Sequence, residues 1–109
     1  MAWLLRDEEV LAALDIAESF RDRSRGLLGR DGFEGALLLR PAHQVHSFGM
    51  RFPIDVAFCT DDLVVARTLC LRPGRITRPS VRCRCVIEAQ AGAFDRWRLR
   101  PGDELEVRP

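Results

Sequence analysis

The segment IDVAFCTDDLVVARTL, residues 54–69, decides the fold class, because two apolar runs flank a short acidic turn. In the first run the side chains alternate in kind, as in a strand whose successive residues point to opposite faces of a sheet. One face carries Ile54, Val56 and Phe58, and the other carries Asp55, Ala57 and Cys59. The residues TDD at 60–62 predict a turn, and LVVARTL at 63–69 predicts the second arm of a β-hairpin.

The segments around this hairpin predict further strands. ALLLR at 36–40 predicts a buried strand that Pro41 ends, and VHSFGM at 45–50 predicts an alternating strand with His46, Phe48 and Met50 on one face. CRCVIEA at 83–89 and ELEV at 104–107 predict two more strands, the last one after a β-turn at RPGD. Residues 1–18 predict one or two strands, with a helix left open for EEVLAAL at 8–14. RPGRITRPSVR at 72–82 predicts a loop.

Two segments predict helical structure. In SFRDRSRGLLGRDG, residues 19–32, Ser19 is a candidate N-cap, and Phe20, Leu27 and Leu28 share one helical face. Gly29 suits the left-handed end of such a helix. GAFDRW at 92–97 predicts a turn or a single helical turn.

These elements predict a mainly β protein, a compact β-sandwich or barrel-like fold in one domain over residues 1–109, with one short N-terminal helix. No apolar run approaches the roughly 20 residues that a membrane-spanning helix needs. The first ten residues carry no basic region before their apolar part and predict no signal peptide. We therefore expect a cytoplasmic protein.

Composition excludes little. All 17 basic residues are arginine and the formal net charge is +1, which by itself implies no particular partner. Cysteines stand at 59, 70, 83 and 85, and in a cytoplasmic chain they are expected to be free thiols that pack as small apolar side chains.

Five motifs in order resemble one known family. They are RSRGLLGR at 23–30, HSFGMRFPIDVAF at 46–58, VV at 64–65, VIEAQAG at 86–92 and RPGDELEV at 100–107. The chain resembles the domain-of-unknown-function family 192 of small bacterial and archaeal β-rich proteins, from about residue 10 to its end. This resemblance implies a β-sandwich-like fold with a short helix near the start, and it implies no activity.

The resemblance carries particular residues over to this chain. They are Arg25, Gly26, Leu27, Met50, Pro53, Asp55, Phe58, Glu88, Gly92, Gly102 and Asp103. The chain departs from the family pattern at Leu63, where a glycine is usual after the two aspartates. It also departs at Ala89 and Gln90, where LP often follows the glutamate.

The candidate ligand-binding residues form a polar set among apolar strands: Arg25, His46, Arg51, Asp55 and Glu88. A buried carboxylate is costly unless a cation or hydrogen-bond donors meet it, so a partner of this kind is expected at Asp55. Such a partner is either a structural contact that specifies the fold or part of a groove for a small polar ligand or a partner's peptide. We favour a binding or accessory module of this kind, with no cofactor, over an enzyme.

Two other classes stay open. A metal-assisted or acid–base hydrolase would use His46 with Asp55 and Glu88, although the spacing of His43, His46 and the cysteines matches no zinc motif, and no metal ligand is assigned. The arginine-rich loop at 67–84 could bind an anionic partner or nucleic acid, but it lacks the interleaved aromatic residues of single-strand binders.

Overall fold

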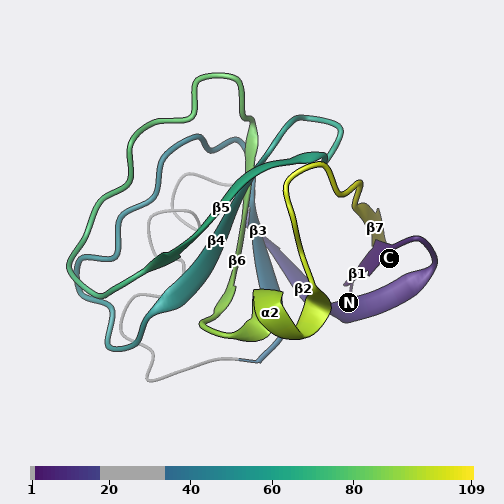
Figure 1. The fold of residues 1–109 in the computed structure, drawn as a ribbon, viewed down its shortest axis with the longest axis horizontal. Coiled ribbons are helices and arrows are strands. Elements are labelled where there is room, and N and C mark those ends of the chain that lie inside the picture. Colours follow the sequence, from purple (N-terminus) through teal and green to yellow (C-terminus); the bar gives the residue numbers. More distant parts are fainter. Residues whose placement is uncertain (1, 18–33) are drawn as a thin grey trace.

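In a computed structural model of the chain, residues 2–17 and 34–109 are described. They form one mixed sheet of seven strands in the order β5-β4-β6-β3-β2-β1-β7 (Figure 1). The elements are β1 (Ala2–Arg6), β2 (Glu9–Ala17), β3 (Ala36–Leu39), β4 (Ile54–Cys59), β5 (Val65–Leu71), β6 (Cys85–Gln90), α2 (Ala93–Trp97) and β7 (Glu106–Arg108). Within these residues β2 and β3 run parallel, and the other neighbouring strands are antiparallel.

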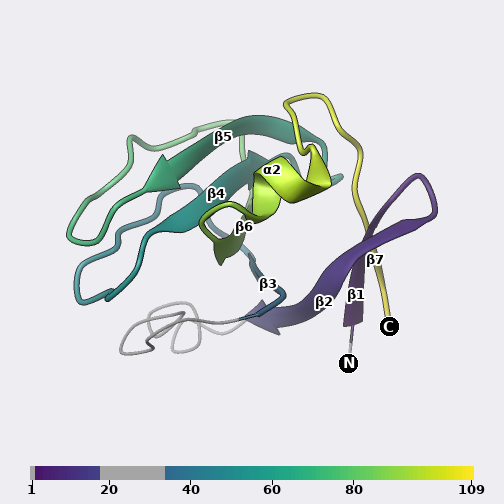
Figure 2. The same ribbon diagram turned by 60° about the horizontal axis from the view of Figure 1, so that its bottom comes forward.

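The alternation of side chains divides the core into two clusters, one on each face of the sheet. On one face, which we call the helix face, Ala57, Cys59, Ile87 and Ala89 pack with Ala93 and Phe94 of α2. On the other, the loop face, Ile54, Val56, Phe58 and Val86 pack with Val45, Met50, Phe52 and Cys83 from the loops before β4 and β6. Figure 2 shows α2 lying in the curve of the sheet, between β6 and the β1–β2 hairpin.

The mainly β class and the β4–β5 hairpin are confirmed, but the sandwich or barrel is wrong in its finer part. The described strands make a single curled sheet, and the layers on its two faces are α2 and loops rather than a second sheet. The two edges approach at an isolated bridge between Val64 and Glu104, and β7 has only three residues. A ladder that short does not close a barrel.

Two of the predicted strands came out differently. The amino-terminal residues form two strands, and EEVLAAL belongs, after its first residue Glu8, to β2 rather than to a helix. The strand predicted at 45–50 is wrong: this segment is a loop, and its β-type pairing is limited to the isolated bridge between His46 and Ile76 of the loop before β6. Instead of a regular strand ladder, Ser47 forms hydrogen bonds with the segment 72–75.

The helical predictions divide between the two parts of the chain. The predicted N-terminal helix at 19–29 lies outside the described residues. The segment GAFDRW forms α2, as the prediction of a single helical turn allowed. The described helical structure is far too short and polar to cross a membrane.

Candidate functional site

Asp55 lies on the helix face, where it fixes the beginning of α2. Its Oδ2 atom accepts hydrogen bonds from the backbone N–H groups of Gly92 and Phe94, each at 3.0 Å, and the side chain is buried. These donors meet the carboxylate as expected, because a buried carboxylate without donors would be strongly destabilising. This contact corresponds to the first of the two alternatives for Asp55, a structural contact that specifies the fold, and it sets the position of α2.

Glu88 lies on the opposite face of the sheet. It is paired across the strands with Val56 and Leu37, whereas Asp55 is paired with Ala89. Because successive residues of a strand point to opposite faces, this register separates the two carboxylates. Asp55 and Glu88 therefore do not line one groove, and they do not form the carboxylate pair that a glycoside-hydrolase mechanism needs.

The environment of Glu88 is unusual for an acid. The residue is 4% exposed, and burial raises the pKa of its carboxyl group to about 7. Among the described residues no hydrogen bond or ion pair reaches this carboxylate. A group with this pKa changes its protonation state near neutral pH, although burial by itself does not make it a catalytic acid.

The other predicted residues lie in different places. His46 and Arg51 are exposed in the loop that precedes β4, and Arg25 lies outside the described residues. The His46 ring stacks on Phe48 with 5.2 Å between ring centroids, and its Nδ1 accepts the Phe48 N–H at 3.3 Å. In the described part of the structure, the predicted residues therefore do not come together in a single groove.

The cysteines are free thiols in this structure. Cys59, Cys83 and Cys85 are buried, Cys70 is exposed, and burial raises the pKa of Cys59 to about 12. A thiol with so high a pKa is a poor nucleophile and a poor metal ligand at neutral pH. In residues 2–17 and 34–109, no three His, Cys, Asp or Glu side chains are grouped so that they could hold a metal ion.

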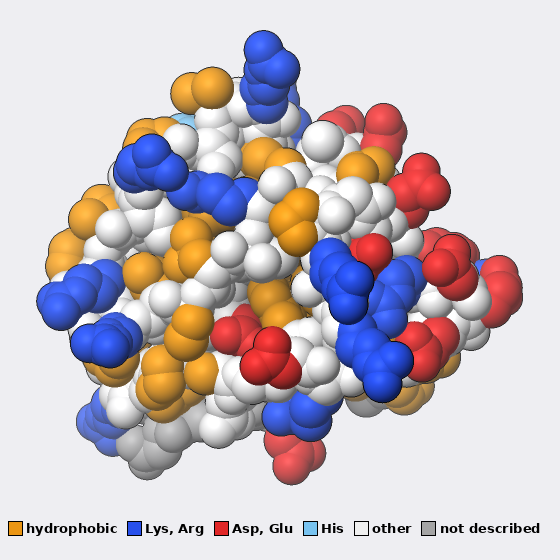
Figure 3. Space-filling model, in the orientation of Figure 1, with side chains coloured by type: hydrophobic (Ala, Val, Ile, Leu, Met, Phe, Trp, Pro, Cys, Tyr) orange, Lys and Arg blue, Asp and Glu red, His pale blue; other side chains and the backbone are white. Residues whose placement is uncertain are grey.

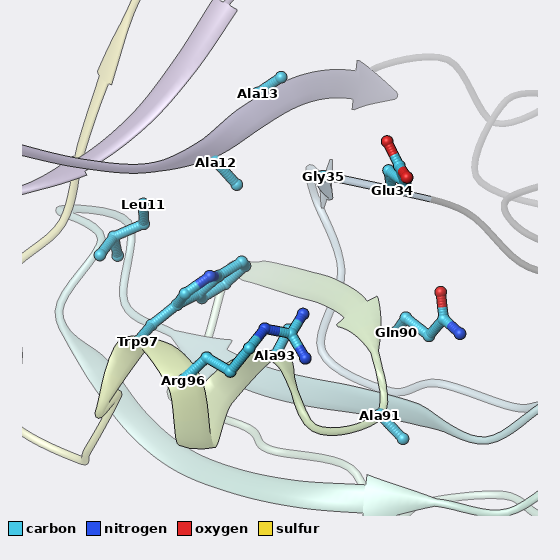
Figure 4. A pocket seen from close by; sticks show the side chains of 10 residues that line it. All are labelled: Leu11, Ala12, Ala13, Glu34, Gly35, Gln90, Ala91, Ala93, Arg96 and Trp97. Atoms are coloured by element: carbon cyan, nitrogen blue, oxygen red, sulfur yellow. The ribbon is translucent and has the colours of Figure 1, made fainter.

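A cleft that sequence reasoning did not find opens where β3 begins. It has a volume of about 660 Å³ and lies between β2, the end of β6 and α2 (Figure 4). It is lined by Leu11, Ala12, Ala13, Glu34, Gly35, Gln90, Ala91, Ala93, Arg96 and Trp97. Three short segments that are far apart in the sequence line the cleft, so no local sequence motif predicts it.

The backbone explains why the cleft exists. The ladder between β2 and β3 begins at Leu14 and Ala36, and Gly35 turns the chain there with φ +83°. A Cβ at Gly35 would stand 2.7 Å from the carbonyl oxygen of Ala13, so only glycine lets the chain pass this close to β2. In the residues described, positions 9–13 of β2 have strand partners only on the β1 side.

The polar groups of the cleft come mainly from α2. Figure 4 shows the Trp97 indole beneath Leu11 and Ala12, the Arg96 guanidinium on the same wall, and Glu34 across the opening. Within the described part of the chain, no carboxylate pairs with Arg96. An unpaired guanidinium beside an apolar wall can bind a carboxylate through two parallel hydrogen bonds.

Arg6 of β1 holds this wall in place. Its guanidinium donates to the carbonyl oxygens of Trp97 at 2.6 Å and Arg98 at 3.1 Å, and it pairs with Asp103 at 2.9 Å. The end of α2 is thereby tied to β1 and to the turn before β7. The side chains of Arg96 and Trp97 are thus presented from a fixed backbone, which favours binding because little order is lost.

The fold defines a class of small, mainly β proteins in which a short helix packs on one curled mixed sheet. The chain belongs to the DUF192 family, described as uncharacterized ACR, whose model matches residues 3–107. The resemblance seen in the five motifs is thereby confirmed.

Individual relatives agree with this membership. The UPF0127 protein PH1112 of Pyrococcus horikoshii is 29% identical over 96 residues, which cover 84% of each chain. A crystal structure of a protein of unknown function from Novosphingobium aromaticivorans matches with a TM-score of 0.79 and 16% identity, over 96% of this chain and 82% of that chain. A crystal structure from Sinorhizobium meliloti matches with a TM-score of 0.82 and 20% identity, over 97% and 91% of the two chains. At these identities the solved structures share the fold.

Proposed function

We propose that this protein is a binding module whose cleft between β2, β6 and α2 takes an extended peptide segment that carries a carboxylate. The observation that supports this proposal is the slot left where β3 begins, beside a stretch of β2 that has no strand neighbour on that side among the described residues. A peptide that adds a strand to such an edge gains backbone hydrogen bonds, and nearby pockets select its side chains.

The dimensions of the slot suit one extended chain. The space in line with β3 is bounded by β2 on one side and, beyond Gln90 where β6 ends, by α2 on the other. An extended chain beside β2 adds about one strand spacing, ~4.8 Å, whereas a helix with its side chains is roughly 10 Å across, so the extended chain is the smaller ligand for this space. A bulge between Leu4 and Leu5 also shifts the β1–β2 register beside Leu11, and such irregularities are common next to binding sites.

The charges of the lining select the ligand. Arg96 supplies on one wall a cation that pairs with no carboxylate of the described residues, so a terminal carboxylate or an acidic side chain of the peptide fits there, away from Glu34 across the opening. Trp97 and Leu11 supply apolar surface for a neighbouring side chain, and Gln90 supplies an amide that both donates and accepts hydrogen bonds. Mixed apolar and polar linings of this kind are typical of ligand sites.

The proposal is tested by NMR titration of the ¹⁵N-labelled full chain with two pooled tetrapeptide libraries, one ending in a free carboxylate and one in an amide. We expect the carboxylate pool to shift the amide signals of Leu11, Ala13 and Gly35 and the Trp97 indole signal. The amide pool should shift them much less. Arg96→Gln should remove the difference between the pools, because it removes the cation and leaves the shape of the cleft.

A matched variant controls for charge in general. Arg100→Gln removes an exposed arginine that does not line the cleft, and it should titrate like the unmodified protein. The proposal is wrong if neither pool shifts these signals. The assignment of Arg96 as the cation is wrong if the two pools shift these signals equally in the unmodified chain, as they should in Arg96→Gln.

A further inference from the structure

Two loops that cover the loop face carry arginines and no acid. The stretches 35–54 and 63–87 contain no Asp or Glu, but they contain Arg40, Arg51, Arg67, Arg72, Arg75, Arg78, Arg82 and Arg84. Most of these arginines are exposed. Figure 3 shows basic side chains along the rim where these loops lie, whereas at the other end, around the β1–β2 hairpin and the C-terminus, acidic side chains lie beside a second group of basic ones. The net charge of +1 therefore conceals two stretches of the chain that carry basic residues and no acidic ones.

Ser47 joins the two loops into one fixed surface. Ser47 is fully buried, its N–H donates to the Arg75 carbonyl at 2.7 Å, and its hydroxyl oxygen accepts the Arg75 N–H at 2.9 Å. Its carbonyl also accepts the Gly74 N–H at 2.9 Å. Next to this contact, Val45 and Thr77 form two hydrogen bonds with each other, at 2.9 and 3.0 Å. Residues 45–48 are thus held against residues 72–77 by direct hydrogen bonds.

The same contact places aromatic rings beside the arginines. His46 and Phe48 flank the buried Ser47, their rings stack at an interplanar angle of 22°, and Phe48 is 52% exposed. The bridge between His46 and Ile76 sets this pair next to the arginine-rich loop. The arginine-rich loop has no aromatic residue, so the sequence alone provided little support for nucleic-acid binding. The tertiary structure places the rings of His46 and Phe48 beside this loop.

We propose that this surface, made of His46, Phe48, Arg72, Arg75, Ile76 and Arg78, binds single-stranded nucleic acid. Phe48 stacks on an unpaired base as a continuation of the His46–Phe48 stack, and the arginines contact the phosphates on either side. Base stacking on aromatic rings together with a basic groove is the usual basis of binding to single strands without sequence preference. This surface lies on the loop face and is separate from the cleft, so it goes beyond the proposed peptide site.

An anionic membrane is the other partner that such a surface could suit, because Ile76 and Val81 are exposed apolar residues among cations. The stacked pair favours nucleic acid. The two rings are stacked and Phe48 is half exposed, which suits stacking on a base, whereas insertion into lipid favours apolar side chains without the polar His46 ring beside them. The experiment separates the two partners.

Fluorescence anisotropy of the full chain with a labelled 12-nucleotide oligothymidylate tests the proposal. We expect binding at low salt that weakens steeply as salt rises, because phosphate contacts release counterions. Phe48→Ala should weaken binding about 5- to 150-fold through the loss of one stacked base. Arg75→Gln should weaken binding and lower the slope of log affinity against log salt by about 1.

Controls and contrary outcomes are clear-cut. Both variants change exposed side chains, so circular dichroism should show an unchanged fold, and Arg100→Gln should bind the oligonucleotide like the unmodified chain. Absence of binding at low salt would overturn the proposal. Equal affinity for Phe48→Ala, or for a duplex of the same length, would overturn the stacking role. Binding to phosphatidylglycerol vesicles without binding to the oligonucleotide would assign the surface to membranes instead.

Discussion

Two buried carboxylates illustrate how little the residue type alone says about its role. Asp55 and Glu88 lie within one pair of neighbouring strands, and both are less than 10% exposed. Asp55 receives two backbone N–H donors from the beginning of α2, whereas Glu88 receives no hydrogen bond from the described residues. The oxygen of the first carboxyl group is therefore met by hydrogen-bond donors, whereas the second carboxyl group is buried at a cost when it is charged.

Replacing Asp55 tests its structural role. Asp55→Ala leaves the Gly92 and Phe94 N–H groups without an acceptor, and we expect it to lower the free energy of unfolding by about 3 kcal/mol. Asp55→Asn keeps an oxygen that can accept both bonds and should cost about 1 kcal/mol. Urea denaturation measures both values. Asp15→Ala, at an exposed position of β2, is the control and should change stability by less than about 0.5 kcal/mol; equal losses for the two Asp55 variants would contradict the role of the hydrogen bonds.

Glu88→Gln should change how stability depends on pH. Burial raises the pKa of Glu88 in the folded chain from 4.5 to about 7, so between these values the folded chain holds a proton that the unfolded chain has lost. Stability therefore falls as pH rises through this window, by about 3 kcal/mol at most, and is flat above it as far as this group is concerned. Denaturation between pH 4 and pH 8 should show that the glutamine variant lacks this slope and is the more stable protein at the upper end. An unchanged slope would mean that Glu88 keeps an ordinary pKa.

At the level of elements, the β4–β5 hairpin shows a residue held in an unfavourable backbone conformation. Leu63 has φ +66°, a region that favours glycine, and its side chain is buried in the cluster of the helix face. The turn is held by the Leu63 N–H to the Thr60 carbonyl at 2.9 Å and by the Val64 N–H to the Thr60 hydroxyl at 3.2 Å. Leucine is kept there because its burial offsets the backbone strain of about 1–2 kcal/mol.

Two substitutions at Leu63 separate these effects. Leu63→Ala loses the buried side chain and keeps a Cβ in the left-handed region, so it should cost about 3 kcal/mol. Leu63→Gly loses the same packing but relieves the strain, and we expect it to be more stable than the alanine variant by about 1 kcal/mol. Thermal or urea unfolding of the three proteins measures the order. If alanine is the more stable of the two, the positive φ at this position carries no strain.

Elements with a strong local pattern were predictable, and those with a competing contact were not. The alternation in residues 54–69 is sufficient for the hairpin, because each strand carries its own two faces. The alternation in 45–50 is equally regular, yet Ser47 turns inward to the segment 72–75 and the strand does not form. That contact joins residues almost thirty positions apart, so no local pattern reports it.

At the level of the whole molecule, the order of strands should set which parts open first. β4 and β6 lie inside the sheet with partners on both sides, and every residue of β4 is buried. β7 has three residues and a single strand neighbour in the described sheet. We expect the amides of β4 and β6 to exchange hydrogen only through global unfolding and those of β7 to exchange through local opening. Exchange measured by NMR as a function of denaturant distinguishes these routes; equal protection of β7 and β6 would contradict the expectation.

The candidate site was only partly within reach of the sequence. That Asp55 needs hydrogen-bond donors followed from its place in an apolar strand, and the structure supplies them. Whether Asp55 and Glu88 lie on the same face could not be predicted, because the sequence does not give the register between β4 and β6. Ligand binding by His46, Arg51, Asp55 and Glu88 stays a prediction, as does any contribution of Arg25.

The sequence by itself determined the mainly β class, the central hairpin and the family, because side-chain alternation, turn residues and ordered motifs are local properties of the chain. The tertiary structure alone decided the order of the strands, the separation of the two carboxylates, the cleft beside α2 and the joining of the rings to the arginine-rich loop. Each of these depends on which distant segments pair and in what register. Pairing is settled by the free energy of the whole packed core, which no short stretch of residues contains.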